Sequence, residues 1–343
     1  MDYRSRVVRP LPPVSVTVTW TSLHAQVHRT LRQRHLFTPG QRLLVAVSGG
    51  QDSLCLLKLL LDLRPHWHWQ LAIGHCDHRW RSDSAANAAH VQTLAEQWQL
   101  PFWLQTAAEI PRTEAQARTW RYEVLTEIAQ TQNYTAVVTG HTASDRAETL
   151  LFNLLRGSGT DGLQALVWQR SLATGLQLVR PLLGLTRTQT GDFCREQNLP
   201  IWEDSTNQDY QYRRNRIRQE LIPYLQTHFN PQVEQAIAQT AELLQAEVDY
   251  LEAQAQALLA QVSTMLPERG LNRSSLQAVP LALQRRVVKG FLQTHLPHAP
   301  NFDQVEKVVA LISAANGSRT DPFPGGAIAT VSDAWIYLVN SNH

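Results

Sequence analysis

Cysteine, lysine and long apolar runs are scarce in this sequence. Of 343 residues only Cys55, Cys76 and Cys194 are cysteines, and no two of them form a C-x-x-C pair. That scatter disfavours a disulfide framework or a zinc ribbon and suits a reducing compartment. No apolar run reaches membrane-spanning length, and no N-terminal apolar stretch resembles a secretion signal. We therefore expect a cytoplasmic protein without a membrane partner.

Positive charge is carried almost entirely by arginine. The sequence has 31 Lys and Arg residues and a formal net charge of +2, yet only Lys58, Lys289 and Lys307 are lysines. Arginine suits bidentate phosphate contacts and base stacking, although a compositional bias of the source genome explains the excess equally well. The composition, 43% hydrophobic and 17% charged, is otherwise that of a soluble globular protein long enough for two domains.

One stretch combines a buried strand, a glycine turn and a helix start. The apolar run Leu43–Val47 predicts the strand, and leucines at helical spacing follow Ser53. Free backbone N–H groups converge where such a turn meets a helix, so phosphate is the expected ligand; a plain βα turn is the alternative. The residues of this expected phosphate cradle are Ser48, Gly49, Gly50, Gln51, Asp52 and Ser53.

Two commoner nucleotide motifs are absent from this turn. The pattern G-x-x-x-x-G-K-S/T needs a lysine after its last glycine, and the nearest lysine, Lys58, lies inside the predicted helix. No G-x-G-x-x-G stands here, which weakens a dinucleotide interpretation. The stretch instead resembles the S-G-G-x-D-S loop of the PP-loop ATP pyrophosphatases, which cleave ATP between its α and β phosphates.

Strands and helices alternate along the first part of the chain. This alternation predicts an α/β fold with a doubly wound parallel sheet, whose ligands bind beyond the carboxyl ends of the strands. The expected strands are 43–47, 70–75, 102–106, 135–139 and 176–179, and the expected helices are 21–38, 52–63, 82–99, 114–131, 144–156 and 186–197. Residues 157–175 are expected to form a loop or lid over the site.

Polar clusters follow the predicted strands. His75, Asp77 and Arg81 come after the second strand, where Asp77 could bind Mg²⁺ and Arg81 could neutralise phosphate; a solvated loop is the alternative. Arg118 and Arg121 share one face of a predicted helix and could reach a common anion, although surface arginines are common.

The cluster after the fourth strand is Gly140, His141, Asp145 and Glu148. Asp145 and Glu148 are three residues apart on one helix face, so the two carboxylates point the same way and can hold Mg²⁺ or an ammonium, or act as a base. The helix dipole alone would also favour acids at this position.

Residues 212–218 form a basic stretch of arginines with a tyrosine and an asparagine among them. Such a composition is typical of segments that contact RNA. A solvated, salt-bridged helix start is the alternative. The candidate substrate-binding residues are Arg214, Asn215 and Arg218, with Arg156 further upstream. The nearby acids Glu203 and Asp204 could supply the salt bridges of the alternative, and they belong with Asn207 to a motif just before the stretch.

We divide the chain into three parts. Residues 1–20 are expected to be a flexible extension, and residues 21–225 the catalytic domain. Residues 226–343 are expected to form a mostly helical domain that ends in a β-hairpin around Ser332-Asp333. This last part carries no chemical cluster, so we expect it to bind rather than catalyse.

The order of motifs resembles the bacterial tRNA(Ile) lysidine synthases. Their pattern includes S-G-G-x-D-S, H-x-D-H-x-x-R, E-A-x-x-R-x-x-R-Y, T-G-H-x-x-x-D-x-x-E-T, R-P-L-L and R-N-x-I-R, and residues 42–225 supply these in order. Two departures stand at Thr142 and Ser144, where family members often carry a histidine and an aspartate. Roles that depend on those two positions are therefore in doubt.

The resemblance implies a mechanism. ATP binds with its pyrophosphate in the 48–53 loop, helped by His75, Arg81 and Gly140, with Mg²⁺ on Asp52 or Asp77. The first anticodon base of tRNA(Ile) with anticodon CAU, a cytidine, attacks the α phosphate through its C2 carbonyl oxygen. Arg118, Arg121 and Arg81 offset the phosphate charge. L-lysine, its ammonium held by Asp145 and Glu148, then expels AMP, with His141 as a candidate base.

Two alternatives stay open. One is another PP-loop tRNA modifier such as a thiolase, which usually needs paired cysteines. The other is a catalytically inactive nucleotide- or RNA-binding protein. The sequence also leaves a homodimer as one option for assembly.

Overall fold

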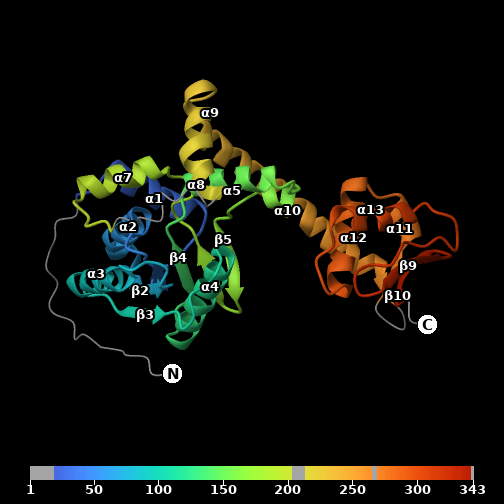
Figure 1. Ribbon diagram of the computed structural model, residues 1–343, viewed down its shortest axis with the longest axis horizontal. Helices are drawn as coiled ribbons and strands as arrows, with labels where there is room; N and C mark the ends of the chain where they lie inside the picture. Colours follow the sequence, from blue (N-terminus) through green and yellow to red (C-terminus); the bar gives the residue numbers. More distant parts are fainter. Residues whose placement is uncertain (1–18, 203–212, 265–268, 341–343) are drawn as a thin grey trace. The chain divides into compact units, whose positions relative to one another are not determined.

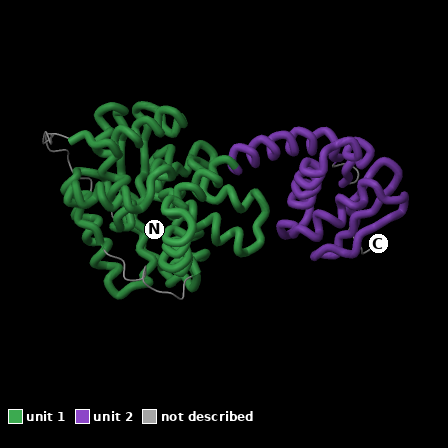
Figure 2. The backbone as a smooth tube through the Cα atoms, turned by 90° about the horizontal axis from the view of Figure 1, so that it is seen from above, with its two compact units in different colours: residues 1–243 green, residues 244–343 purple. Residues whose placement is uncertain are grey.

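The computed structural model describes residues 19–202, 213–264 and 269–340. The chain separates into two compact units, Met1–Leu243 and Leu244–His343 (Figure 2). The division falls inside one long helix rather than at residue 225. Residues 1–18 of the expected extension, and Glu203, Asp204 and Asn207, lie outside the described residues.

The first unit is built on a six-stranded sheet in the order β3-β2-β1-β4-β6-β5 (Figure 1). The strands are β1 Arg42–Ala46, β2 Gln70–Asp77, β3 Phe102–Thr106, β4 Ala136–Thr139, β5 Gln169–Ala173 and β6 Leu176–Val179. All neighbours pair parallel except β5, which pairs antiparallel with β6. The predicted doubly wound α/β fold is confirmed.

Helices cover both faces of this sheet. Leu43 and Val45 of β1 belong to the core beneath α1, α2, α3 and α7, whereas Leu44 belongs to the core beneath α4. This alternation explains why β1 is an unbroken apolar run, since both of its faces are buried. The helices are α1 Ser22–Gln33, α2 Gln51–Trp67, α3 Ser84–Gln97, α4 Glu114–Thr131, α5 Ala143–Leu155 and α7 Arg187–Glu196.

The strand order reverses between β1 and β4. Strands β2 and β3 continue from β1 on one side, and β6 lies beyond β4 on the other. A crevice for ligands is expected at such a switch point, beyond the carboxyl ends of the two strands. Helices α2 and α5 both begin there, so the 48–53 loop and the Asp145 cluster meet at one place.

The expectation of a loop or lid over 157–175 is wrong. The segment contains the short helix α6 (Thr160–Leu163) and the edge strand β5. Most of β5 is exposed and polar, with Gln169, Arg170 and Ser171 in a row, so the strand lacks the apolar alternation that would have predicted it. Its backbone pairing with β6 forms it instead.

The end of the first unit is a broken helix. It consists of α8 Arg213–Arg216, a π-helical turn η2 Ile217–Leu221, and α9 Ile222–His228. Pro223 has no N–H to donate to the carbonyl of Gln219, and the Ile222 amide instead bonds to the Ile217 carbonyl five residues back. The proline therefore accounts for the widened turn.

The second unit begins inside the long helix α10 (Val233–Val262). Its core packs α12 Leu281–His295 and α13 Phe302–Leu311 against a sheet in the order β7-β8-β10-β9. The predicted closing hairpin is confirmed as β9 Ala327–Ser332 and β10 Trp335–Asn340. Two short strands that the sequence did not predict form one edge of this sheet, β7 Ser263–Thr264 and β8 Gly270–Asn272. The short helix α11 Arg273–Gln277 follows them.

Within the described residues, no helix combines the length and the apolar character needed to cross a bilayer.

Candidate active site

The 48–53 loop is preorganised by its own side chains. Gly49 has a φ of 87°, a region that favours glycine. The Ser53 hydroxyl donates to the Gly50 carbonyl at 2.8 Å and accepts from the Ser48 amide at 3.2 Å. No side chain caps the N-terminus of α2, which leaves its first amides directed at the loop. This is the geometry of an anion site.

Three distant segments hold this loop in place. The Nδ1 atom of His75 donates to the Val47 carbonyl at 2.7 Å, and Asn87 Nδ2 donates to the Ser48 carbonyl at 3.0 Å. The Trp202 amide donates to the Gly49 carbonyl at 3.0 Å. His75 therefore supports the cradle from β2, and its pKa is lowered mainly by burial, which keeps the ring neutral.

Gly140 sits where the fourth strand meets the start of α2. A Cβ atom at Gly140 would lie 2.7 Å from the Asp52 carbonyl oxygen. Because that neighbour is backbone, no side-chain movement relieves the clash. Gly140 thus permits the close approach of β4 and the phosphate cradle.

Asp52 is tied to the start of α7. Its Oδ2 accepts from Arg187 Nε at 3.1 Å and Nη2 at 3.0 Å, and its Oδ1 accepts from the Thr190 hydroxyl. Gln51 bonds the same helix end, through the Arg187 carbonyl and Thr190. Arg187 and Thr190 were not predicted, because no motif signal in the sequence marks the start of α7 as part of the site.

Asp145 is oriented by a capping box at the start of α5. Its Oδ2 accepts from the Thr142 amide at 2.8 Å and from the Thr142 hydroxyl at 2.9 Å. Its Oδ1 lies 3.6 Å from Arg187 Nη2 and 3.7 Å from Arg218 Nη2, so it has charge contacts but no hydrogen bond from the described residues. One oxygen of Asp145 is thus an open acceptor.

Both sequence departures have structural roles. Thr142 is the cap that fixes Asp145, as just described. The Ser144 hydroxyl accepts from the Arg187 amide at 3.0 Å. Thr142 and Ser144 therefore help to position the same cluster of charges.

Glu148 is paired more completely. Arg218 Nε donates to its Oε1 at 2.6 Å and Nη2 to its Oε2 at 2.8 Å, a bidentate pair. The side chain of Glu148 is only 4% exposed. Asp52, Arg187, Asp145, Arg218 and Glu148 thus form one alternating chain of charges, which we call the charge cluster.

Burial and arginines set the protonation of the three acids. Burial raises the pKa of Asp52 and of Glu148 in spite of Arg187 and Arg218. Burial would also raise the pKa of Asp145, but the Arg187 guanidinium and the Thr142 hydrogen bonds outweigh it and lower that pKa. Of these three carboxyl groups, Asp145 therefore has the strongest tendency to be ionised.

A second cluster, of arginines, lies around Tyr122 on α4. Burial alone would raise the pKa of Tyr122, but the charges of Arg118, Arg180 and Arg121 together lower it. The predicted pair Arg118 and Arg121 is thus brought together, and their arrangement favours an anion. Arg180 is 2% exposed and also donates to the Val167 carbonyl at 2.7 Å.

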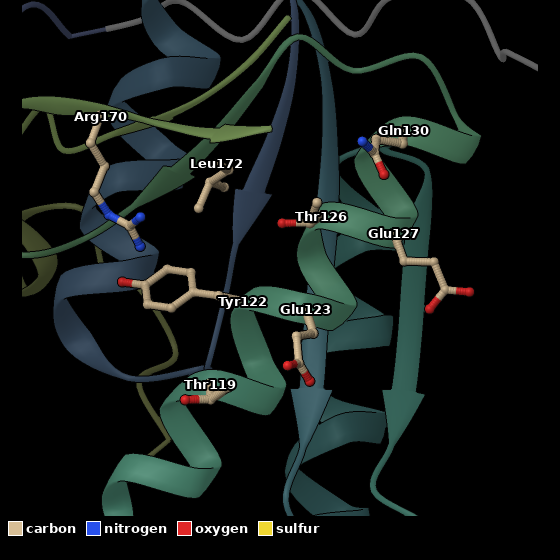
Figure 3. A pocket seen from close by; sticks show the side chains of 8 residues that line it. All are labelled: Thr119, Tyr122, Glu123, Thr126, Glu127, Gln130, Arg170 and Leu172. Carbon is tan, nitrogen blue, oxygen red and sulfur yellow. The ribbon is translucent and has the colours of Figure 1, made fainter. Parts of the chain in front are cut away.

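A hollow of about 530 Å³ opens beside this arginine cluster, between α4 and β5 (Figure 3). Figure 3 shows Arg170 and Tyr122 facing one another across it, and the guanidinium carbon of Arg170 is 5.1 Å from the centre of the ring. The hollow is lined by Thr119, Tyr122, Glu123, Thr126, Glu127, Gln130, Arg170 and Leu172.

His141 lies between the two clusters. Its Nδ1 is 2.8 Å from the Thr139 hydroxyl. Burial, followed by the nearby arginines and opposed by Asp145, lowers the pKa of His141 to about 3. The ring is therefore neutral at physiological pH and is a weak base.

The expected metal ligands Asp52 and Asp77 do not form a ready-made site. Across the described ranges, no group of three or more His, Cys, Asp or Glu side chains could hold a metal. Asp77 Oδ1 accepts from the Arg79 amide at 2.8 Å, while Oδ2 accepts nothing from the described chain. Because Mg²⁺ commonly uses one or two carboxylates completed by phosphates, Asp77 fits that ion better than the fully bonded Asp52.

The remaining predicted residues have other contacts. Arg81 Nε pairs with Asp83 Oδ1 at 2.8 Å. Arg214 Nη2 donates to the Thr149 hydroxyl at 3.1 Å, and Arg156 lies over the Phe152 ring with its guanidinium carbon 5.3 Å from the centre. Asn215 lies on α8 beside Arg214.

Comparisons with known proteins agree with this architecture. Residues 21–225 match the PP-loop domain, and residues 271–333 match the TilS substrate binding domain. The sequence is 62% identical to a tRNA(Ile)-lysidine synthase of a Nostoc species, over 94% of this chain and 98% of the relative. It is 36% identical to a chloroplastic tRNA(Ile)-lysidine synthase of Zygnema circumcarinatum, over 86% of this chain and 80% of the relative.

A solved structure shares the fold of the first unit. The U34-tRNA thiolase of Methanococcus maripaludis has a TM-score of 0.55 and 13% identity, over 64% of this chain and 78% of the thiolase. At that identity the likeness concerns the fold alone. The site geometry, both domain matches and the high identity to complete relatives lead to one conclusion: this chain belongs to the tRNA(Ile)-lysidine synthase family.

Proposed function

We propose that this chain is a ligase that joins L-lysine to the first anticodon base of tRNA(Ile) with anticodon CAU, at the expense of ATP. The observation that supports this best is the charge cluster beside the phosphate cradle, with the open Oδ1 of Asp145 among its members. An ATP-binding turn and an ammonium acceptor are then within one crevice. The product, lysidine, switches decoding from AUG to AUA.

The first step transfers AMP to the base. The C2 carbonyl oxygen of the cytidine forms a bond to the α phosphorus, and pyrophosphate leaves with the electron pair of the broken P–O bond. The 48–53 loop holds the pyrophosphate through backbone amides and hydroxyls. Arg118 and Arg121, with Arg180 behind them, stabilise the charge on the transferred phosphate.

The second step uses lysine. One ammonium group of lysine is held by Asp145 Oδ1, with Glu148 as the neighbouring acid, and the attacking amine passes one proton to solvent water before it reaches C2. The C–N bond forms and the C2–O bond breaks, so AMP leaves with the oxygen. A pKa of about 3 suits His141 for accepting a hydrogen bond from the amine rather than for carrying its proton away.

Mg²⁺, when bound, would neutralise charge on the ATP phosphates and would be held by Asp77. Arg81 and His75 lie at the end of the same strand or just after it, where they support the phosphate side of the site. We assign the activity to the cytoplasm, and the homodimer stays a prediction.

One assay tests the proposal against its alternatives. The full chain is incubated with ATP, L-lysine and tRNA(Ile) bearing CAU, with tRNA(Met), which has the same anticodon, as the control. We expect AMP release and a lysine-sized mass gain on the anticodon cytidine of tRNA(Ile) only. Sulfur incorporation would indicate a thiolase, and binding without turnover would indicate an inactive protein.

The cysteines already weigh against a thiolase. Hydrogen bonding to Cys194 and burial raise the pKa of Cys55, and burial raises the pKa of Cys76 to about 12. Such thiols stay protonated at neutral pH and are poor nucleophiles.

A further inference from the structure

A second hollow, of about 560 Å³, lies between the C-terminal half of α5 and the broken helix α8-η2-α9. Its apolar lining comes from Phe152, Leu155, Ile217, Leu221 and Tyr224. We call it the α5 groove. Leu155 is 71% exposed and Tyr224 is 55% exposed, so its rim is open to solvent.

The charge around the α5 groove is mostly positive. Among the described residues, Arg156, Arg213 and Arg216 line it together with one acid, Glu220, which is paired with Arg216 at 3.3 Å. Two guanidinium carbons lie near the Phe152 ring, at 5.3 Å (Arg156) and 5.9 Å (Arg214) from its centre. An aromatic ring among arginines suits a base with its phosphate, because the ring stacks and the cations pair.

The α5 groove and the charge cluster are built on the same two helical segments. Glu148 and Phe152 are one helical turn apart on α5, so they lie on the same face. On the opposite wall, Arg218 bonds Glu148 and Arg214 bonds Thr149. The helices that hold the acids therefore also form the walls of the groove. The π-helical turn at Ile217–Leu221 lies in the lining, and such turns occur often at functional sites.

We propose that the α5 groove binds an unpaired nucleobase of the substrate RNA, next to the cytidine that is modified, by stacking it on Phe152. This inference rests on the proposed function, because it requires an RNA with a splayed loop at the charge cluster. Single-stranded loops offer such bases, whereas a paired stem does not. An apolar protein partner is disfavoured, since three arginines and one paired acid are the charged residues that line the hollow in the described part of the chain.

The test is a double-mutant cycle on binding, with the full chain and full-length tRNA(Ile). Wild type and Phe152→Ala are each titrated with intact tRNA and with tRNAs that lack one anticodon-loop base at a time. We expect Phe152→Ala to weaken binding of intact tRNA by about ten-fold, the scale of one lost base stack. At one loop position, removing the base should weaken tRNA binding by the wild type about ten-fold as well. Removing the same base should weaken tRNA binding by Phe152→Ala almost no further.

Controls separate stacking from folding. Phe152→Tyr keeps the ring and should bind as the wild type does. Phe229→Leu removes another aromatic, 72% exposed and outside the groove lining, and should leave the dependence on every loop base unchanged. ATP binding by each variant reports that the first unit is folded.

Two results overturn the inference and are distinguishable. If the wild type binds tRNA(Ile) and Phe152→Ala binds it equally, or if the two losses add at every loop position, the α5 groove does not stack a base while the proposed function stands. If the wild type binds no tRNA(Ile), the proposed function fails and the inference fails with it.

Discussion

At the scale of single residues, Asp145 is the acid whose environment suits an incoming cation. Its Oδ2 is held by Thr142, and its Oδ1 has charge neighbours without a hydrogen bond from the described residues. Asp145→Asn keeps the shape and removes the charge. We expect it to raise the KM for lysine by about ten-fold or more, the scale of one charge-assisted hydrogen bond, with little change in the KM for ATP.

Steady-state kinetics with lysine and ATP varied separately check this. Asp192→Asn, an exposed acid paired with Arg195 on α7, is the matched control and should behave as the wild type does. An unchanged KM for lysine in Asp145→Asn would remove Asp145 from lysine binding.

Gly140 gives a second prediction at this scale. Gly140→Ala places a Cβ atom 2.7 Å from the Asp52 carbonyl, so β4 or the start of α2 must shift. We expect a loss of about 1–3 kcal/mol in the free energy of unfolding and weaker ATP binding. Gly159→Ala, whose Cβ would meet nothing within 4 Å, is the control. Denaturant unfolding and ATP titration check this prediction. Equal free energies of unfolding and equal ATP affinities for the two variants would contradict it.

The site residues that the sequence predicted are those whose amino-acid type and position after a strand already indicate a role. The glycine turn, Asp145 and Glu148 follow strands, so their meeting at one sheet edge follows from the parallel fold. Their partners Arg187, Thr190 and Trp202 come from other segments, and only the packing of α7 and the following chain brings them in. No spacing in the sequence encodes those contacts.

At the scale of elements, Glu242 of α10 contacts three side chains from earlier segments of the first unit. Glu242 binds Arg34 at 2.7 Å, Arg146 of α5, and the Trp168 indole at 2.7 Å. Arg146 is buried and adjoins Asp145 in the sequence. Glu242→Gln removes a carboxylate that pairs with that buried cation and with Arg34, so we expect a loss of about 1–3 kcal/mol in the free energy of unfolding.

Glu247→Gln is the matched control, because Glu247 is an exposed residue of α10 with no ion pair among the described residues. Thermal unfolding of both variants checks the prediction. Equal stability of Glu242→Gln and the wild type would mean that α10 is held by packing alone.

The helix expected over 114–131 was predicted with the same bounds that the structure gives for α4 (Glu114–Thr131). The edge strand β5 and the small strands β7 and β8 were missed. These strands are short and have few buried apolar residues, so their pairing depends on backbone partners that lie elsewhere in the chain.

At the scale of the whole molecule, His78 makes stability depend on pH. Burial, then the charge of Arg121, lowers the pKa of His78 to about 4, against an ordinary value near 6.5. Between these values the unfolded chain binds a proton that the folded chain does not, so acidification favours unfolding. One such group contributes a slope of up to about 1.4 kcal/mol per pH unit.

His78→Asn should therefore have a flatter stability profile on acidification through this range, whatever its stability at neutral pH. Denaturant unfolding at a series of pH values measures both profiles. Parallel profiles for variant and wild type would show that His78 does not carry the effect.

The central claim is that the cytidine itself is adenylated and that lysine then replaces its oxygen. The most direct measurement uses tRNA(Ile) whose anticodon cytidine carries heavy oxygen at C2, with ATP and L-lysine, followed by mass spectrometry of AMP, pyrophosphate and the RNA. The account predicts heavy oxygen in the AMP phosphate and lysine in the RNA. Heavy oxygen left in the RNA, or released into water with unlabelled AMP, would contradict it.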